Sequence, residues 1–267
     1  MSYAEVIGDP IAHSKSPLIH GFWLEALGID ASYRATRVAP EELGGFIAGR
    51  AADPEWRGCN VTIPHKLAVL AHVGDPGGVG DSIGAANTIA RGQEGLFATN
   101  TDAAGFYAPL ADLDLAGAPV IVIGAGGAAR AVLFALGKIG VGKVSLLNRS
   151  PLKGAALLAK FGLKGEALPL TTPLPPARLV VNASPLGMAG QPPLAIDLAP
   201  LPEEAIVYDL VYAPLETPLL QAADARGLET IDGLDMLIGQ AALAFELFFG
   251  AAPPRERDEE LRALLTA

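Results

Sequence analysis

The fold of this chain is decided by Val120-Ile121-Val122-Ile123-Gly124-Ala125-Gly126-Gly127-Ala128-Ala129-Arg130 and by the alanine-rich segment that continues to Leu136. The β-branched run predicts a strand buried on both faces, and the apolar spacing after the glycines predicts a helix. The pattern G-x-G-x-x-A is typical of a dinucleotide-binding turn: Gly124 allows the sharp turn, Gly126 lets a pyrophosphate approach the backbone, and Ala129 lets the helix pack closely. Glycine-rich turns are common, but both flanking elements are present here, so we predict nucleotide binding.

The next strand, residues 143–147, indicates which nucleotide is bound. It ends at Asn148-Arg149-Ser150, where NAD-binding proteins usually carry an acidic residue for the ribose 2′-hydroxyl, and no carboxylate stands here. Asn148 and Ser150 can donate hydrogen bonds, Arg149 can pair with a 2′-phosphate through its planar fork, and Lys153 adds a second cation. We therefore predict NADP as the cofactor. The alternative is that Arg149 is a solvated loop cation and Ser150 only caps a helix.

Composition restricts the class of partner. The 267 residues are 51% hydrophobic and 18% charged, which is typical of a compact globular protein with one large or two modest domains. The net charge of −10 repels nucleic acid and anionic lipid, so we expect neither nucleic acid nor a membrane as a partner. A small-molecule substrate is expected instead. A homodimer is compatible with these features, and the sequence does not decide the oligomeric state.

The N-terminus and the single cysteine indicate a cytoplasmic protein. The first residues lack a basic region, and no uncharged apolar stretch is long enough to span a bilayer. Cys59 has no partner for an internal disulfide, which suits a reducing compartment. We interpret Cys59 as a small apolar filler of a strand rather than a nucleophile.

The first hundred residues predict a strand–helix series. Strands are expected over residues 3–8, 32–38 and 58–63, with a short helix over residues 40–50. Ser16 is expected to be the N-cap of a first helix with Pro17 in its first position and with Leu18, Phe22 and Leu27 on the buried side. Capping alone would leave Ser14 without a role.

The strand over residues 58–63 carries polar residues at its end. Pro64 is expected to start a helix there, which would project Asn60, Thr62 and Lys66 from the strand end and the following turn. Open α/β sheets bind ligands outside these carboxyl ends. Residues 84–102 then predict a hairpin whose second arm ends in Asp102.

The fold class is therefore α/β with two domains. Residues 1–103 should form a substrate-binding and catalytic domain with a mainly parallel sheet, and residues 104–234 a Rossmann-type NADP-binding domain. Further strands are expected over residues 178–182, 205–211 and 229–231. Helices over residues 234–249, interrupted by the polar Gln240, and 255–265 should pack back on the first domain, so that residues 235–267 complete it.

Several blocks of this sequence resemble the shikimate dehydrogenase family. They cover nearly the whole chain, and several are specific to that family. The blocks are Asn60-Val61-Thr62-Ile63-Pro64-His65-Lys66, Ala86-Asn87-Thr88, Asn100-Thr101-Asp102, the glycine turn, Asn148-Arg149-Ser150, Asn182-Ala183-Ser184, Tyr208-Asp209-Leu210-Val211-Tyr212 with Thr217-Pro218-Leu219-Leu220, and Asp232-Gly233 to Gln240-Ala241-Ala242.

The resemblance implies the NADPH-dependent reduction of 3-dehydroshikimate to shikimate, a step of aromatic amino-acid biosynthesis. It implies that Lys66 and Asp102 are the catalytic pair. The substrate contacts that it implies are Ser14, Ser16, Asn60, Thr62, Lys66, Asn87, Asp102, Tyr212 and Gln240. The cofactor contacts that it implies are Gly124, Ala125, Gly126, Gly127, Ala128, Asn148, Arg149, Ser150 and Lys153, with Ala183, Leu210, Gly233 and Met236 near the nicotinamide. No metal ligands and no role for His65 are implied.

The chemistry of these residue types suits a ketone reduction. The Lys66 ammonium can stabilise a developing alkoxide and protonate it, and Asp102 can orient that amine and accept from a substrate hydroxyl. Taken alone, Lys66 could be a surface lysine and Asp102 a helix cap. Hydroxyl donors at Ser14 and Ser16 and a helix N-terminus can hold a carboxylate without an arginine.

Three alternatives stay open at this point. Related quinate/shikimate dehydrogenases that favour NAD usually carry an acidic residue where this chain has its basic loop. A non-catalytic NADP-binding regulator could share the fold, because fold does not fix function. A third alternative is an enzyme of the same fold that acts on another small hydroxy acid.

Overall fold

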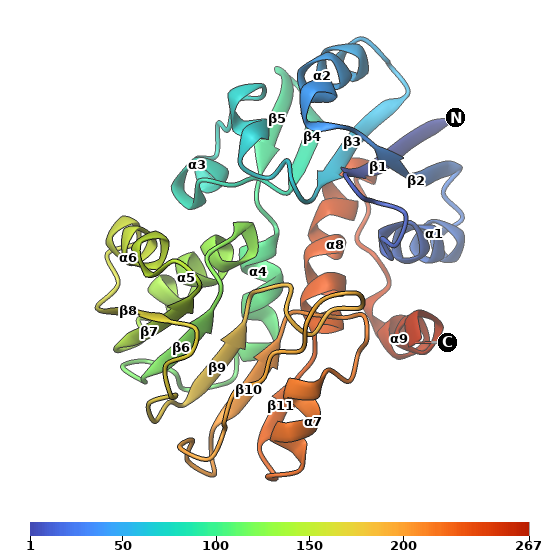
Figure 1. Ribbon diagram of the computed structural model, residues 1–267. Coiled ribbons are helices and arrows are strands. Elements are labelled where there is room, and N and C mark those ends of the chain that lie inside the picture. The colour runs from blue at the N-terminus through green and yellow to red at the C-terminus, as the bar shows by residue number, and fades with distance from the viewer. Residues whose placement is uncertain (267) are drawn as a thin grey trace. The chain divides into compact units, whose positions relative to one another are not determined.

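Two compact units make up this computed structural model, which describes residues 1–266 (Figure 1). Unit 1 consists of Met1–Thr101 together with residues 238–266, and unit 2 is Asp102–Leu237. The boundaries expected from the sequence were 103/104 and 234/235. In the structure the second boundary falls between Leu237 and Ile238, inside the helix α8 (Gly233–Phe249). The first residues of α8 therefore belong to unit 2, and the remainder belongs to unit 1.

Unit 1 is built on a five-stranded sheet of order β2-β1-β3-β4-β5. The strands β1, β2 and β3 are parallel, and β3, β4 and β5 are antiparallel, so the sheet is a strand–helix series closed by a hairpin, as predicted. Its elements are β1 (Ser2–Gly8), α1 (Ser16–Leu27), β2 (Ala31–Arg37), α2 (Leu43–Ala51), β3 (Trp56–Val61), α3 (Val79–Ile83), β4 (Thr88–Gly92), β5 (Gly95–Thr99), most of α8, and α9 (Asp258–Thr266), with 3₁₀ turns at Pro40–Glu42, Ala68–Ala71 and Arg255–Arg257.

The predicted orientation of α1 was wrong. Ile19, His20, Trp23 and Leu24 are buried, whereas Leu18 and Leu27 are each 40% exposed and Phe22 is only half-buried. The alternative face carries Trp23, which has the largest apolar surface to bury. Burying the Trp23 side chain removes more apolar surface from water than burying Leu18 and Leu27 would, so α1 is rotated about its axis relative to the prediction.

The start of α1 also differs from the prediction. The N-cap residue is Lys15, and Ser16 is the first helical residue rather than the cap. The Ser14 hydroxyl accepts a hydrogen bond from the Ser16 backbone N–H at 3.3 Å. Ser14 therefore supplies the capping contact that the sequence had suggested for Ser16.

The helix expected at Pro64 is absent from the described structure. Residues 63–67 form turns, followed by the 3₁₀ turn Ala68–Ala71. The imidazole Nε2 of the buried His65 lies 2.7 Å from the Val38 carbonyl, and the Lys66 carbonyl accepts from the Ala86 N–H at 2.7 Å. These two anchors hold the segment in a compact turn because an α-helix would carry both groups away from their partners.

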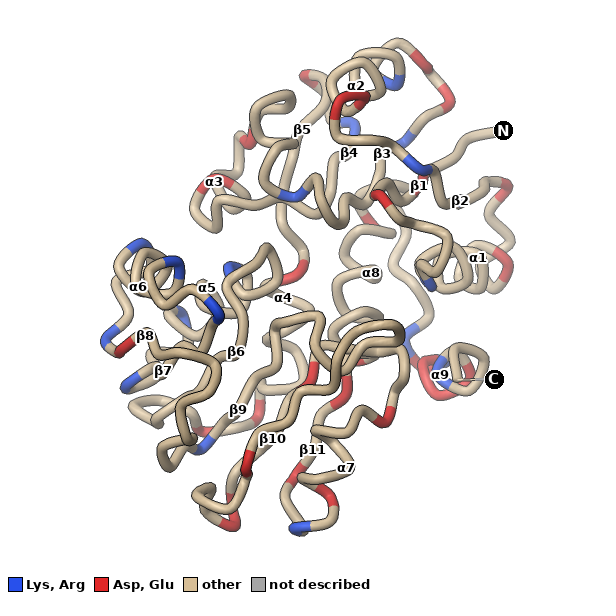
Figure 2. The backbone as a smooth tube through the Cα atoms, in the orientation of Figure 1, with Lys and Arg blue, Asp and Glu red and all other residues tan. Residues whose placement is uncertain are grey.

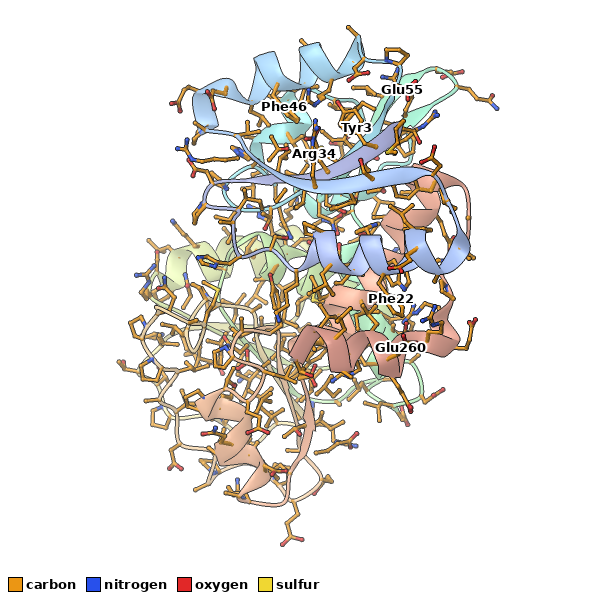
Figure 3. The ribbon with its side chains drawn as sticks, turned by 90° about the vertical axis from the view of Figure 1, so that its right-hand side faces the viewer. Tyr3, Phe22, Arg34, Phe46, Glu55 and Glu260 are labelled. Atoms are coloured by element: carbon orange, nitrogen blue, oxygen red, sulfur yellow. The ribbon has the colours of Figure 1, made fainter. Side chains whose placement is uncertain are left out.

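A buried ion cluster ties β1 to its neighbours. Glu5 is fully buried, and Arg50 donates to its Oε1 at 2.6 Å while Thr36 donates to its Oε2 at 2.5 Å. The guanidinium of Arg34 also reaches Oε2, at 3.4 Å, and lies 4.3 Å from the centre of the Tyr3 ring (Figure 3). A buried carboxylate is tolerated here because every oxygen is paired.

Unit 2 is a six-stranded parallel sheet of order β11-β10-β9-β6-β7-β8, the strand order of a Rossmann fold. Its elements are α4 (Asp102–Tyr107), β6 (Val120–Ile123), α5 (Gly127–Ile139), β7 (Val144–Asn148), α6 (Pro151–Lys160), β8 (Gly165–Pro169), β9 (Leu179–Asn182), β10 (Ile206–Asp209), α7 (Pro218–Asp224) and β11 (Glu229–Ile231), with a 3₁₀ turn at Ala108–Leu110.

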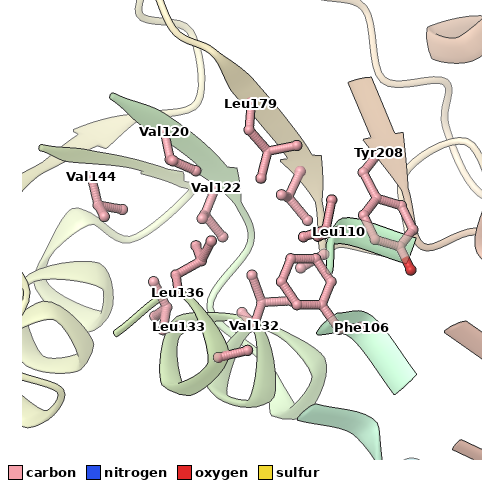
Figure 4. Close-up of a cluster of buried hydrophobic side chains, with 14 of the residues drawn as sticks. Phe106, Leu110, Val120, Val122, Val132, Leu133, Leu136, Val144, Leu179 and Tyr208 are labelled. Atoms are coloured by element: carbon pink, nitrogen blue, oxygen red, sulfur yellow. The ribbon is translucent and has the colours of Figure 1, made fainter. Parts of the chain in front are cut away.

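The deciding strand β6 is buried on both faces, as predicted. Val120 and Val122 belong to the core on the α5 side, where they face Leu133 and Leu136 (Figure 4), and Ile121 and Ile123 belong to the core on the opposite side. The edge strand β8 was not predicted. Its residues are mostly exposed and it ends in Pro169, so it lacks the apolar run that identifies a buried strand.

The end of the chain returns to unit 1, as predicted. Leu261 and Leu265 of α9 are buried, and Arg257, just before α9, places its guanidinium 4.6 Å from the centre of the Phe22 ring of α1. Figure 3 shows Phe22 close to Glu260, which accepts two hydrogen bonds from Arg257. Among residues 1–266, no helix combines the length and apolarity required to cross a membrane.

Candidate active site

The predicted substrate residues of unit 1 follow the ends of β1 and β3. Thr62, directly after β3, donates its backbone N–H to the Ile7 carbonyl at 2.9 Å. A Cβ on Gly8 would lie 2.6 Å from the Thr62 methyl group, so Gly8 is needed for this close approach. The loop that leaves β1 carries Ser14 and Ser16. Thr62 and this loop are therefore at the same end of the sheet, where parallel strands present ligand-binding loops.

Asn60, Asn87 and Gln240 are buried amides joined by hydrogen bonds. Asn60 Nδ2 donates to the Asn87 carbonyl at 3.4 Å, and Asn87 Nδ2 donates to Gln240 Oε1 at 3.2 Å. Gln240 lies in the mostly apolar α8, 153 residues from Asn87 in the chain. The hydrogen bond to Asn87 explains why the polar Gln240 can be buried in this helix, because buried polar side chains are generally hydrogen-bonded.

Asn87 also fixes the chain just before Asp102. Its Oδ1 accepts the Thr101 backbone N–H at 2.7 Å, and its Nδ2 donates to Thr101 Oγ1 at 2.9 Å. Asp102 follows directly as the first residue of α4. Lys66 is anchored close to Asn87 as well, because its carbonyl accepts from Ala86, the neighbour of Asn87. The Lys66 side chain is half-buried.

The predicted cofactor turn joins β6 to α5 with the expected geometry. Gly124 has φ +109°, and a Cβ there would lie 2.8 Å from the Ala183 carbonyl, so only glycine fits. A Cβ on Gly126 would meet no protein atom within 4 Å. The protein's own packing does not require Gly126, which fits the predicted close approach of a pyrophosphate to the backbone.

This turn lies at the topological switch point of the sheet. The strands β6 and β9 are neighbours in the sheet, and the chain leaves them toward opposite sides through Gly124 and Ala183. Doubly wound sheets bind nucleotides in the crevice at this point. The structure therefore brings two separately predicted parts of the cofactor site together.

The loop after β7 carries cations with few acidic neighbours. The Asn148 amide donates to the Ser150 carbonyl at 3.0 Å, which shapes the loop, and Ser150 is the N-cap of α6 without a side-chain cap bond. Within the described residues, Arg149 and Lys153 are exposed and have no carboxylate partner. Residues 120–169 contain seven Lys and Arg and a single acidic residue, and these cations gather around α5 and α6 (Figure 2).

The residues expected at the nicotinamide end come from three neighbouring strand ends. Ala183 donates its N–H to Ile123 O at 2.8 Å, and Leu210 donates to Asn182 O at 3.0 Å. A Cβ on Gly233 would lie 2.5 Å from the Leu210 carbonyl, so α8 begins in direct contact with the end of β10. Met236 of α8 is buried in the hydrophobic core on the α5 side of the unit 2 sheet. Tyr212 is half-buried, and burial raises the pKa of its phenol.

Sequence reasoning gave no role to several buried polar residues beside these sites. Tyr33 and Thr88 bond the amides of unit 1, and Asp209 and Thr217 bond each other at the end of β10. Thr88, Asp209 and Thr217 stood inside quoted motif blocks, and each directly adjoins a strand or helix end, which is the signal that could have identified them. The described residues contain no cluster of three or more His, Cys, Asp or Glu suited to a metal ion.

Comparisons with known proteins agree with this arrangement. Residues 6–89 match the family model of the "Shikimate dehydrogenase substrate binding domain", and residues 233–261 match the "Shikimate 5'-dehydrogenase C-terminal domain". The "Shikimate dehydrogenase (NADP(+))" of Sphingopyxis alaskensis is 69% identical, covering 99% of this chain and 97% of that protein. The protein of the same name from Methylobacterium radiotolerans is 47% identical over 96% and 95%.

A solved structure extends the likeness to three dimensions. The shikimate 5-dehydrogenase of Thermus thermophilus, in complex with NADP(H) and shikimate, is 41% identical, with a TM-score of 0.85 over 99% of this chain and all of that one. The match spans both units and so includes both halves of the predicted machinery. On these grounds the chain belongs to the shikimate dehydrogenase family of NADP-dependent oxidoreductases.

Proposed function

We propose that this chain catalyses the reversible, NADPH-dependent reduction of 3-dehydroshikimate to shikimate, with Lys66 as the proton donor. The observation that carries the proposal is the buried amide group of unit 1. Asn87 bonds both Gln240 and the residue that precedes Asp102, so polar groups suited to a polyol converge beside the anchored Lys66. Such a site discriminates strongly against analogues without the hydroxyls, because its own groups would be left unpaired.

Unit 1 supplies the groups for the substrate. Asn60, Asn87 and Gln240 offer donors and acceptors to hydroxyls, and Ser14 and Ser16 offer hydroxyls at the head of α1 to a carboxylate. Asp102 and Tyr212 complete the proposed set from unit 2, Asp102 as an acceptor for a substrate hydroxyl. Thr62 adds a hydroxyl at the carboxyl end of β3.

Lys66 performs the proton transfer in this proposal. Reduction of a ring ketone creates negative charge on the oxygen, and an ammonium group both stabilises that charge and can neutralise it by giving up a proton. In the oxidation direction the neutral amine takes the proton back. Bound NADPH supplies the hydride.

Unit 2 supplies the groups for the cofactor. The backbone at Gly126 and the N-terminus of α5 suit the pyrophosphate, and Arg149, Lys153, Asn148 and Ser150 suit a 2′-phosphate. The excess of cations in residues 120–169 supports this assignment, because a local positive field attracts a polyanion to a protein of net charge −10. The same excess disfavours the NAD-dependent alternative.

Initial rates of shikimate oxidation with NADP and with NAD, each at several shikimate and quinate concentrations, test the assignment. We expect a strong preference for shikimate with NADP. Activity mainly with NAD or quinate would move the chain to the quinate/shikimate branch. Tight NADPH binding without any turnover would instead favour the regulator.

Two substitutions test the role of Lys66. We expect Lys66→Ala to lower kcat about 10²- to 10⁴-fold, the usual contribution of a general acid, while NADPH binding measured by fluorescence stays unchanged. Lys66→Arg keeps the positive charge but does not release a proton, so it should lose most of the turnover too. Near-native turnover of Lys66→Ala would show that Lys66 only binds substrate.

We also infer that the protein works in the cytoplasm on small molecules alone, without nucleic acid or a membrane. The net charge of −10 and the single, buried Cys59 support this inference. Cell fractionation tests the location, and sedimentation at several concentrations would decide between a monomer and a homodimer.

A further inference from the structure

Lys15 joins the head of α1 to the last turn of α9. It stands between Ser14 and Ser16, and its own carbonyl accepts the backbone N–H of Ile19 at 3.1 Å, which fixes it to the first turn of α1. Its ammonium group donates to the carbonyl of Leu265, 250 residues further along the chain. One residue therefore ties the loop with the proposed carboxylate contacts to the C-terminal helix.

This contact suits the end of a helix. The last carbonyls of an α-helix have no N–H partner within the helix, and they carry a partial negative charge that favours a cation. The last turn of α9 contains no Lys or Arg of its own. Lys15 supplies this cation from the N-terminal part of the chain, and its side chain is half-buried.

The helix α9 is itself held in place. The Leu265 side chain is only 2% exposed, so the core of unit 1 fixes the position of the Leu265 carbonyl. The helix packs beside α1 (Figure 3), and Arg257, just before α9, contacts the Phe22 ring in the middle of α1. Lys15 is a second point of attachment between the two segments, at the head of α1 where the two serines lie.

The start of the same loop is attached by another charged pair. Arg37, the last residue of β2, donates two hydrogen bonds to the Asp9 carboxylate, at 2.8 and 3.0 Å. The Arg37 side chain is 67% exposed, and exposed ion pairs contribute little to stability. Lys15 makes the corresponding contact at the other end of the loop, next to the serines.

We propose that Lys15 is a positioning residue for the substrate carboxylate, which holds Ser14 and Ser16 in place through its contact with α9. This inference rests on the proposed function, because it takes the two serines to bind that carboxylate. The carboxylate takes no part in the hydride transfer, so its contacts act equally on the ground state and the transition state. Loss of the Lys15 contact should therefore raise KM and leave kcat unchanged.

Two substitutions at Lys15 test the contact in the full chain. Lys15→Met keeps the length of the side chain but cannot donate, and we expect the KM for shikimate to rise about three- to ten-fold, the effect of one lost hydrogen bond. The kcat and the KM for NADP should stay native, because the proposed NADP contacts lie in unit 2. Lys15→Arg keeps a cationic donor and should leave the KM for shikimate within about two-fold of native.

A substitution in α9 separates positioning from direct contact with the carboxylate. Ala263 is exposed in the last turn of α9, and Ala263→Gly loosens that turn because glycine is a poor helix former. It leaves the serine loop and the Lys15 side chain unaltered. We expect it to raise the KM for shikimate about two- to five-fold in the chain that keeps Lys15, and not at all in the Lys15→Met background, where the contact is already lost.

Ala48→Gly is the matched control for the change in α9. Ala48 is an exposed residue of α2 in the same unit, so its replacement weakens a helix in the same way without reaching Lys15. Its KM for shikimate should stay native. Should Lys15→Met fail to fold, the comparison of Ala263→Gly with Ala48→Gly still decides the question.

The outcomes distinguish this inference from the proposed function. If Lys15→Met raises the KM for shikimate but Ala263→Gly leaves it native, Lys15 contacts the substrate itself and the positioning role is overturned. A native KM in Lys15→Met would overturn it as well, and so would equal increases in the KM for shikimate and for NADP, because a general loss of structure would then be the cause. Absence of shikimate turnover by the unchanged chain would instead overturn the proposed function.

Discussion

Burial keeps the titratable side chain of His20 uncharged in the folded protein. Its ring stacks on Tyr33 at 3.9 Å between centroids and 2° between planes, and within the described residues neither ring nitrogen has a hydrogen-bond partner. Desolvation lowers the pKa of His20 to about 3 from 6.5. The ring is therefore neutral in the folded protein near pH 7 and packs among aromatic side chains, Trp23, Tyr33 and Phe245.

This depressed pKa predicts a stability that depends on pH. Between pH 6.5 and about 3 the unfolded chain binds a proton at His20 that the folded chain does not. Protonation of His20 therefore does not weaken the folded state above pH 6.5, and the free energy of unfolding decreases as the pH falls below that value. At pH 5 the loss amounts to about 2 kcal/mol. His20→Phe should remove it, so that its free energy of unfolding falls less between pH 7 and pH 5.

Urea unfolding at pH 7, 6 and 5 measures this difference. His13→Gln is the control, because His13 is exposed and its replacement should leave the wild-type pH dependence in place. An unchanged pH dependence in His20→Phe would show that His20 binds its proton equally well in the folded and the unfolded protein.

Single residues also show the reach of sequence reasoning. The need for glycine at Gly124 was predicted from spacing, and the structure gives the reason in its φ of +109° and the nearby Ala183 carbonyl. The buried state of Cys59 was predicted as well. The rotation of α1 was not, because which of two apolar faces is buried depends on partners that are distant in sequence.

At the scale of elements, a buried carboxylate joins the ends of β9 and β10 to α7. Asp209 accepts from Asn182 at 2.8 Å, from Thr217 at 2.7 Å and from the Val211 N–H at 3.0 Å. Burial raises the pKa of Asp209, and these three donors oppose the rise. The segments that they join carry Ala183 and Leu210, which we place near the nicotinamide.

Asp209→Asn should therefore weaken cofactor binding. The new NH₂ group cannot accept from Thr217 or Asn182, and a buried donor left unpaired costs about 1–3 kcal/mol. We expect a loss of that size in unfolding free energy and a larger rise in the KM for NADP than in the KM for shikimate, from steady-state kinetics.

The control for this prediction is Asp224→Asn, an exposed aspartate of α7, which should stay within about 0.5 kcal/mol of wild type. If Asp209→Asn loses stability but both KM values stay native, Asp209 holds the fold and does not shape the cofactor site.

At the scale of the whole molecule, unit 1 is discontinuous in sequence. Residues 1–101 need residues 238–266 to complete them, and α9 contributes the buried Leu261 and Leu265. The proposed substrate residue Gln240 also comes from this returning segment. Changes near the C-terminus should therefore affect the unit that holds the N-terminus.

Leu261→Ala tests this dependence. Removing a fully buried leucine should cost about 2–5 kcal/mol of unfolding free energy, measured by chemical denaturation. Leu264→Ala is matched to it on the same helix, but Leu264 is 47% exposed and its loss should cost less than about 0.5 kcal/mol. Similar losses for the two variants would show that α9 is not an integral part of unit 1.

The sequence by itself determined the α/β class, the Rossmann-type turn and the cofactor, because these follow from local patterns: β-branched runs, glycine spacing and a basic loop without a carboxylate. The return of the terminal helices to unit 1 was also predicted correctly. The sequence did not reveal β8, the rotation of α1 or the turn after Pro64. Only the tertiary structure decided these, and it alone joined Asn60, Asn87 and Gln240 by hydrogen bonds. The physical reason is that such contacts depend on which distant groups can pair once water is excluded, and no local spacing records that pairing.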